Sequence, residues 1–420
     1  MKIRLYFDLS CRELKKFKKA SIILQTVHLC FGTWALLKLL FTRNLNYGMA
    51  LVLVLFCVSN FSCQQQQESL DKVNSYKQNA ADSDEAANDA IPTQSKLIAA
   101  LANDTIQRIA FGSCNKQSAP QPLWQEILAH RPDVWLWTGD NIYGDTEDMN
   151  VLRKKYAQQK ENGNYQALLR STPIFGIWDD HDYGKNDGNK LYPKRKESRD
   201  LMLDFLDVPK DNPVWQREGA YQSYELGQKG KRIKVILLDT RYFQDQLQRN
   251  PNRKAHNNYL LDTTGTILGE AQWAWLTNEL SKSTAQIHLI ISSIQVLAND
   301  HGYEKWGNFP KERQRLLDLL AQNQVSHPIL ISGDRHIGEI SKMPLQGANG
   351  EIFHLYDITS SGLTHSYRKA KEENQLRVSP LVVNKNYGLL KIDWTQEQPS
   401  ITVNLSGLEG TVFYEETLEF

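Results

Sequence analysis

Metal-binding residue types recur where β-rich segments of this 420-residue chain end. Carboxylates at several neighbouring strand ends would repel one another unless a cation lay between them, and thiols, phenols and imidazoles are themselves metal ligands. The pattern therefore predicts a metal centre. Its candidate residues are Cys114 in RIAFGSC, Asp140 and Tyr143 in TGDNIY, Asp179, Asp180, His181 and Asp182 in DDHD, Gln295 in SSIQ, and Asp334 and His336 in SGDRH.

Short apolar runs, most of them dense in β-branched and aromatic residues, predict the strands that position these side chains. The runs cover residues 108–114, 133–143, 172–182, 233–241, 286–295, 327–336 and 353–362. Amphipathic patterns between them predict helices at 122–130, 147–170, 194–206, 269–283 and 310–323. Strands that alternate with helices indicate an α/β fold, in which ligands bind at the carboxyl ends of the strands. The helix-free segment after residue 386 is expected to form edge hairpins of a second sheet.

Taken together and in order, these motifs resemble the PhoD-like alkaline phosphatases, a branch of the binuclear metallophosphoesterases. The sequences that carry the resemblance are GSC, GDNIYGD, WDDHDYGKND, LDTRYF and SGDRHIGEI, between about residue 106 and residue 394. The resemblance implies a four-layer α/β/β/α sandwich that hydrolyses phosphate esters. Family members commonly carry an N-terminal β-domain, which is expected to be absent here because only a short segment separates Cys63 from the first strand.

The resemblance also implies two ion sites that share one carboxylate. A thiolate, a phenolate, an imidazole and a carboxylate suit Fe(III), with zinc as a substitute, whereas a set of carboxylate oxygens suits Ca(II) or Mg(II). The expected cofactors are therefore Fe(III) and Ca(II). By resemblance, the iron ligands are Cys114, Asp140, Tyr143 and His336, and the calcium ligands are Asp140, Asp180 and Asp334.

Three further residues are expected to act near the ions. His181 lies between acids and is expected to face the phosphate, where it stabilises developing charge or protonates the leaving alkoxide, while a metal-activated water attacks phosphorus. Arg241, in LDTR, either contacts phosphate or forms a salt bridge with Asp239. Gln295 is a candidate for contact with metal or substrate.

The first 63 residues have the features of an export signal or a membrane anchor. A basic start precedes an apolar stretch at 21–41, and a second apolar run at 49–63 ends in Ser62 and Cys63, as a lipoprotein cleavage site does. A retained membrane helix is the alternative, and Met49 is an alternative start. Residues 64–100 are expected to form a disordered tether and 101–420 the catalytic domain. The protein is thus expected in the cell envelope, held by a lipid or a helix, with this domain periplasmic or extracellular.

Charge and composition narrow the class of partner. The chain has 49 Lys and Arg against 48 Asp and Glu, so no basic excess indicates a nucleic-acid partner. The expected substrate is a phosphate ester, and monoesters and diesters both remain open because one metal centre can serve both. A nuclease or phospholipid hydrolase on the same scaffold is the alternative, followed by a non-catalytic metal-binding envelope protein. The sequence does not indicate an oligomeric state.

Overall fold

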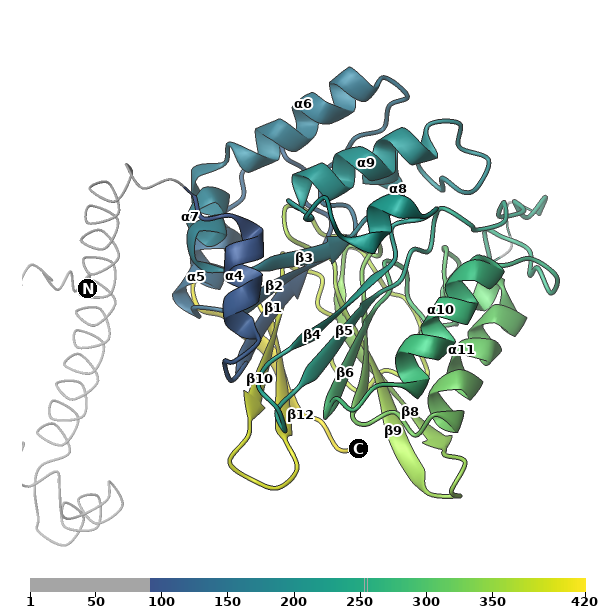
Figure 1. Ribbon diagram of the computed structural model, residues 1–420. Coiled ribbons are helices and arrows are strands. Elements are labelled where there is room, and N and C mark those ends of the chain that lie inside the picture. The colour runs from purple at the N-terminus through teal and green to yellow at the C-terminus, as the bar shows by residue number, and fades with distance from the viewer. Residues whose placement is uncertain (1–90, 253, 255) are drawn as a thin grey trace, which may run out of the picture. The chain divides into compact units, whose positions relative to one another are not determined.

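Two six-stranded sheets carry the fold in a computed structural model that describes residues 91–252, 254 and 256–420 (Figure 1). In spatial order, the first sheet contains β12 (Val412–Thr417), β11 (Ser400–Ser406), β10 (Tyr387–Asp393), β1 (Arg108–Gly112), β2 (Val134–Thr138) and β3 (Ile174–Ile177). The second contains β4 (Gln222–Leu226), β5 (Ile233–Leu237), β6 (Ile287–Ile291), β7 (Pro328–Ser332), β9 (Ile352–Ser360) and β8 (Gly338–Gln346).

The inner strands of each sheet are parallel, which places their carboxyl ends at one edge. Strands β1, β2 and β3 are parallel neighbours in the first sheet, and β5, β6, β7 and β9 are parallel neighbours in the second. Every residue of β2, β3, β5, β6 and β7 is buried, as expected of strands covered on both faces. The predicted convergence of strand ends is therefore met in both sheets.

Alternating side chains of the strands join the two sheets to each other and to the helices outside them. In β5, Val235 and Leu237 belong to the hydrophobic core that includes the first sheet, whereas Ile236 belongs to the core that includes two outer helices. These helices are α10 (Gly269–Ser281) and α11 (Pro310–Gln322). On the other side, Trp124 of α5 (Leu123–Ala129) packs edge-on against Trp135 of β2, with ring centroids 4.9 Å apart. The four-layer α/β/β/α arrangement is thus confirmed.

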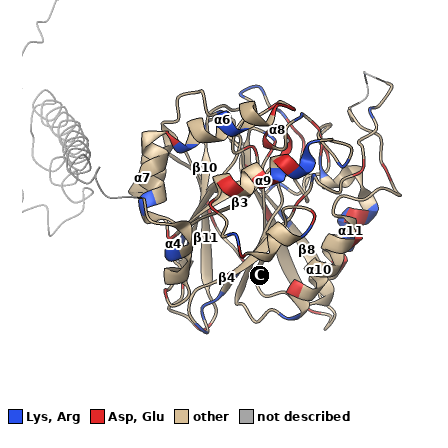
Figure 2. Cartoon of the chain, turned by 45° about the horizontal axis from the view of Figure 1, so that its top comes forward, with Lys and Arg blue, Asp and Glu red and all other residues tan. Residues whose placement is uncertain are grey.

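The remaining helices mostly match the predicted ones, with one split. The 147–170 pattern forms α6 (Met149–Lys160) and α7 (Gly163–Ser171), because Asn162 caps the second helix through its side-chain oxygen. Helix α9 (Arg195–Phe205) follows as expected. A short helix that the sequence pattern did not indicate, α8 (Asp180–Tyr183), lies within DDHD and its neighbouring tyrosine. Basic and acidic residues are interspersed over the helices (Figure 2), in keeping with the balanced charge.

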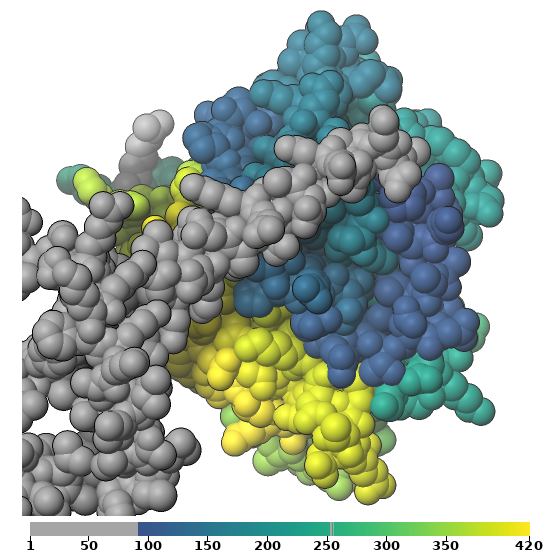
Figure 3. Space-filling view, turned by 90° about the vertical axis from the view of Figure 1, so that its left-hand side faces the viewer, coloured from purple at the N-terminus to yellow at the C-terminus, as the bar shows by residue number. Residues whose placement is uncertain are grey.

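The C-terminal segment forms strands at a sheet edge, as expected, but it joins a different sheet from the one expected. Strands β10, β11 and β12 do not belong to the second sheet; they extend the first, with β10 antiparallel to β1. Figure 3 shows the yellow C-terminal strands beside the blue segment that begins at residue 91. Alternation in a sequence identifies a strand, but its neighbour in the sheet depends on which strand edge the rest of the chain leaves open.

The folded part begins earlier than the expected end of the tether at residue 100. Helix α4 (Gln94–Leu101) packs by Leu101 into the hydrophobic core, and Gln94 accepts a hydrogen bond of 2.8 Å from the backbone of Ile174. The expected export or anchor segment 1–63, Cys63 and the tether up to residue 90 lie outside the described residues. Among the helices that are described, none is long and apolar enough to cross a membrane.

Candidate metal centre

The carboxyl ends of the inner strands bring five of the six predicted metal ligands into groups that could hold an ion. The groups overlap through shared acids, since Asp140 belongs to two of them and Asp180 to three. Within each group the ligand atoms lie within 4.8 Å of one another. The groups are Cys114, Asp140 and His336; Asp140, Asp180 and His181; Asp179, Asp180 and Asp334; and Asp180, Asp187 and Glu304.

Tyr143 completes the predicted set. Its phenol oxygen lies 3.0 Å from Nε2 of His336, which places it at the group formed by Cys114, Asp140 and His336. The thiol of Cys114 is itself 3.6 Å from a carboxylate oxygen of Asp140. The thiol, phenol, imidazole and carboxylate that the sequence assigned to one ion are therefore neighbours, while their role as ligands stays a prediction.

Backbone conformation at these residues is unusual. Cys114, Asp140, Asp334 and His336 have φ angles of 58°, 49°, 65° and 55°, in the left-handed region that residues with a side chain seldom occupy. Cys114, Asp140 and Asp334 each lie two residues after a strand that ends at the shared edge, and His336 lies in the turn between β7 and β8. Such strain persists where the surrounding fold imposes it, and it is typical of functional sites.

The electrostatics of the cluster fit bound cations. Burial first, and then the neighbouring Asp180 and Asp179, hold the pKa of Asp140 well above its usual range. Burial and the carboxylates of Asp140 and Asp334 likewise raise the pKa of the Cys114 thiol. Among the described residues, Oδ1 of Asp180 and Oδ2 of Asp179 are buried without a hydrogen-bond partner. A cation would stabilise the ionised form of every one of these groups and supply the missing partner.

His181 lies at the same edge, on α8. Its Nδ1 is 2.7 Å from a carboxylate oxygen of Asp145, and its ring lies against that of Tyr143 with centroids 4.2 Å apart. Burial alone would lower the pKa of His181, but Asp140, the hydrogen bond with Asp145 and Asp180 together raise it to about 11. In the metal-free protein the imidazole is therefore held protonated beside the cluster. It also belongs to one candidate metal group, so its function has to be tested.

Arg241 forms a salt bridge, but with partners that the sequence did not indicate. The side chain is fully buried, and it donates from Nε to Asp179 at 2.6 Å and from Nη1 to Glu304 at 2.8 Å. Asp239, the partner expected from sequence proximity, does not contact the guanidinium. It accepts the indole N–H of Trp178 and three backbone N–H groups, including that of Arg241. The expected salt bridge with Asp239 is therefore replaced by one with Asp179 and Glu304, and contact of Arg241 with phosphate stays a prediction.

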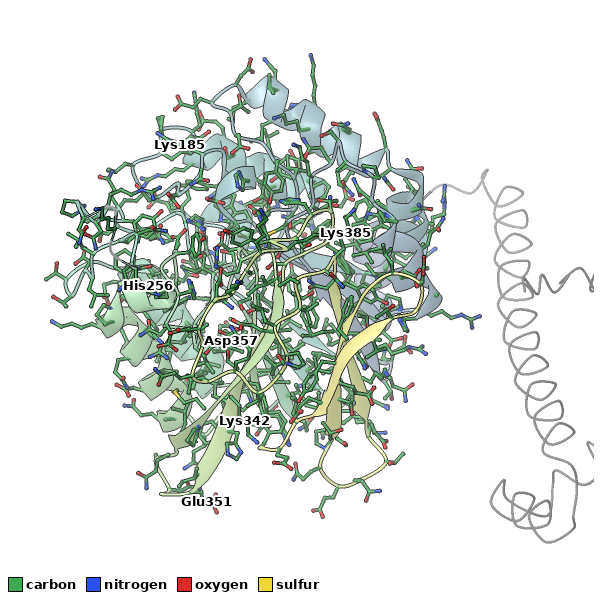
Figure 4. All side chains as sticks on the ribbon, turned by 180° about the vertical axis from the view of Figure 1, so that it is seen from behind. Lys185, His256, Lys342, Glu351, Asp357 and Lys385 are labelled. Atoms are coloured by element: carbon green, nitrogen blue, oxygen red, sulfur yellow. The ribbon has the colours of Figure 1, made fainter. Side chains whose placement is uncertain are left out.

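The side-chain amide of Gln295 donates to two protein groups. Its Nε2 lies 2.7 Å from Oε1 of Glu339 and 2.8 Å from Oγ1 of Thr359, and the side chain is buried. The segment that follows it is fixed by Asp357 of β9, labelled in Figure 4, which accepts the backbone N–H groups of Val296 and Leu297. These bonds hold the chain between β6 and α11. Oε1 of Gln295 is buried without a hydrogen-bond partner among the described residues, and contact of Gln295 with metal or substrate stays a prediction.

Four residues that were not among the predicted site residues lie in or beside the cluster, namely Asp187 and the three that follow. Asp145 holds His181, and its position two residues beyond Tyr143 in GDNIYGD was a signal for it. Glu304, in the long loop after β6, contacts Arg241 and belongs to a candidate metal group. His365 lies 3.0 Å from the Tyr143 phenol oxygen, and it follows β9 by a polar stretch that gave no periodic signal.

Comparisons with known proteins identify the family and the fold of the chain. Alkaline phosphatase D of Bacillus subtilis (strain 168) is 23% identical over 290 residues, which cover 58% of this chain and 48% of the relative. The chain thus spans about half the length of that curated relative. Among solved structures, PhoD matches with a TM-score of 0.60 at 17% identity, over 76% of this chain and 69% of PhoD.

A more distant match shows the same fold. Purple acid phosphatase PPD1 from yellow lupin (Lupinus luteus) seeds matches with a TM-score of 0.50 at 12% identity, over 76% of this chain and 54% of that protein. The family model described as PhoD-like phosphatase matches residues 109–402, well over half of the chain. The resemblance drawn from the motifs is confirmed, and the chain belongs to the PhoD-like phosphatase family.

Proposed function

We propose that this protein hydrolyses phosphate esters at a two-ion centre built from the strand ends of both sheets. The observation that carries the proposal is the overlap of the candidate groups through Asp140 and Asp180, which lets neighbouring ions share carboxylates. When bound, the ions would turn water into a nucleophile near neutral pH and neutralise charge on the phosphate. Family membership supports a phosphatase, and the choice between monoesters and diesters belongs to this proposal.

The residues of the chain would hold and complete this centre. Cys114, Tyr143 and His336 would hold one ion with Asp140, and their thiolate, phenolate and imidazole favour Fe(III). Asp180 and Asp334 would hold the second with Asp140, and their oxygens favour Ca(II). We assign these identities on ligand chemistry, with zinc and magnesium as the competing ions.

His181 would serve the leaving group. Asp145 fixes its Nδ1 at 2.7 Å, so Nε2 is the nitrogen free to donate a proton to the departing alkoxide. Arg241 would act indirectly: its hydrogen bond to Asp179 holds that carboxylate of the cluster in position. Neither role requires that the two residues bind an ion.

The test combines metal analysis with turnover of two matched substrates. The purified full-length protein is assayed with a chromogenic phosphomonoester and its bis-ester analogue, with and without added calcium. Iron bound to the protein and calcium-dependent hydrolysis would support the centre as proposed, and the ratio of the two rates would choose between phosphatase and phosphodiesterase. A metal-free protein with full activity would contradict it. Assays with nucleic acid and phospholipid test the alternative substrates.

We also propose that the protein acts in the cell envelope, where it would meet external phosphate esters. The support is the pattern of residues 49–63, an apolar run that ends at Cys63. If Cys63 is lipid-modified, labelled fatty acid should be incorporated into the protein, and Cys63→Ala should abolish the label. Recovery of the unprocessed chain in the cytosolic fraction would exclude both the lipid and the membrane helix.

A further inference from the structure

The residues around His365 form a segment that joins the backbones of two candidate ligands. On one side, the backbone N–H of Leu363 donates to the carbonyl of Ser113 at 3.2 Å, next to Cys114. On the other, the N–H of Tyr367 donates to the carbonyl of His336 at 2.8 Å. The segment 363–367 is thus fixed to both sides of the group that contains Cys114 and His336.

The hydrogen bonds of Thr364 determine which nitrogen of His365 carries the proton. The Thr364 hydroxyl donates to the carbonyl of Cys114 at 3.1 Å and accepts the backbone N–H of Lys116 at 2.8 Å. Because a hydroxyl has a single proton, its remaining contact, 3.0 Å to Nδ1 of His365, must be donated by the imidazole. In the neutral ring, Nε2 is then left as an acceptor.

That acceptor faces the phenol of Tyr143. Nε2 of His365 is 3.0 Å from the Tyr143 oxygen, and Nε2 of His336 is also 3.0 Å from it. The phenol has one proton, and an acceptor with a fixed tautomer directs it toward His365, which would take up this proton when Tyr143 binds an ion as a phenolate. The lone pairs of the phenol oxygen then remain available on the side of His336, where the candidate iron group lies.

We propose that His365 is a positioning residue for Tyr143, which it reaches through a hydrogen-bond chain that starts at the carbonyl of Cys114. Through Thr364 and His365, the backbone of one candidate ligand sets the direction of the side chain of another. His365 itself belongs to none of the candidate metal groups formed by the described residues. The inference rests on the metal centre of the proposed function.

The test measures how tightly the full-length protein holds Zn²⁺, used as the probe ion, by competition with a chelator. His365→Ala should weaken Zn²⁺ binding by about 10- to 100-fold, the usual effect of removing a hydrogen-bond partner of a metal ligand. Tyr143→Phe should weaken it as well. The variant with both changes should bind no more weakly than Tyr143→Phe alone, because His365 would have nothing left to position.

Matched variants separate this role from a general effect on folding. Thr364→Ser keeps the hydroxyl and should bind Zn²⁺ as the unchanged protein does, whereas Thr364→Val should weaken binding. His130 also pairs with a tyrosine, at 2.9 Å from the Tyr387 oxygen, but neither residue belongs to a candidate group, so His130→Ala should leave Zn²⁺ affinity unchanged. The melting temperature of each metal-free variant reports separately on folding.

Three results would overturn the inference in distinguishable ways. Unchanged Zn²⁺ affinity in His365→Ala, or losses from His365→Ala and Tyr143→Phe that simply multiply in the double variant, would refute the role of His365 alone. A protein that binds Zn²⁺ yet hydrolyses no phosphate ester would refute the proposed function, while the affinities would still judge His365. A protein that binds neither Zn²⁺ nor Ca²⁺ would refute both.

Discussion

The guanidinium of Arg241 holds together two acids from different parts of the chain, Asp179 and Glu304, with no exposure to water. Removal of one partner from a buried ion pair leaves an uncompensated charge, which is more damaging than the loss of an exposed pair. Arg241→Met should therefore lower the free energy of unfolding by about 3–5 kcal/mol. Denaturant unfolding of the metal-free protein measures it.

An exposed pair provides the control. Arg232 and Glu225 are 3.1 Å apart, with each side chain 38% exposed, so Arg232→Met should change the free energy of unfolding by only about 0–1 kcal/mol. Equal effects from the two substitutions would show that the network around Arg241 does not stabilise the fold.

Asp145 should set the pH range in which His181 is protonated. Removal of its negative charge lowers the pKa of His181, so the protonated imidazole is lost at a lower pH. Asp145→Asn should therefore move the alkaline limb of the profile of kcat against pH to lower pH and leave metal content unchanged. In the same loop, Asp148 caps α6 rather than contacting His181, so the profile of Asp148→Asn should match that of the unchanged protein.

Direct substitution of His181 distinguishes its two candidate roles. As a proton donor, it should contribute about 10²- to 10⁴-fold to turnover, and His181→Ala should lose that factor with metal content intact. Loss of bound metal together with activity would instead identify His181 as a ligand of the group that it shares with Asp140 and Asp180.

At the level of the elements, the turn after β2 depends on a single glycine. Gly139 has a φ of 103°, and a Cβ there would lie 2.6 Å from Cβ of Asp179 and 2.9 Å from Cβ of Ser293. Gly139→Ala should thus force the end of β2 away from α8 and from the second sheet, and weaken both stability and metal retention. Chelator competition and thermal unfolding measure these two effects.

A glycine without these constraints is the comparison. At the start of α7, a Cβ on Gly163 would meet nothing within 4 Å, so Gly163→Ala should be neutral or stabilise by up to about 1 kcal/mol. If Gly139→Ala and Gly163→Ala changed the stability equally, the close contacts at Gly139 would not contribute to it.

The elements also show what could be predicted from sequence. Cys114, Asp140, Asp180 and Asp334 were predictable because each follows a strongly apolar run, and parallel strands bring such ends together. The two partners of Arg241 were not predictable, because Asp179 and Glu304 lie far from it in the sequence and contact it only in the folded chain. His365 was missed since its segment is positioned by backbone bonds to Ser113 and His336, which leave no pattern in the sequence.

For the molecule as a whole, the buried acids link stability to pH and metal. Burial raises the pKa of Asp179, Asp334 and Glu304 to about 7 each. Unfolded carboxyls titrate near pH ~4, so between about pH 4 and 7 the metal-free folded state holds protons that the unfolded chain releases. The contribution of these three acids to the free energy of unfolding is therefore fully present below that window and is lost as the pH rises through about 7.

Cations should reverse this trend, because they favour the ionised carboxylates and bind more tightly as protons leave. The rise in melting temperature that metal produces should be larger at pH 8 than at pH 5, as thermal unfolding with and without chelator would show. In Asp334→Asn, which removes one of the three acids, the difference between the two pH values should shrink. An equal rise at both pH values would contradict the assignment of these acids to the metal centre.

The pairing of β1 with β10 joins Arg108 to Lys391, which lie far apart in the sequence. The two edges of β1 are therefore paired at different times during synthesis. Strand β1 can pair early with β2, but its other edge stays open until the chain beyond residue 386 has left the ribosome. Contacts between such distant parts of a chain form slowly, and an open strand edge can pair wrongly in the meantime. The turn that presents Cys114 is therefore secured late, and a chain that stops before β10 should bind metal poorly even though it contains every predicted ligand.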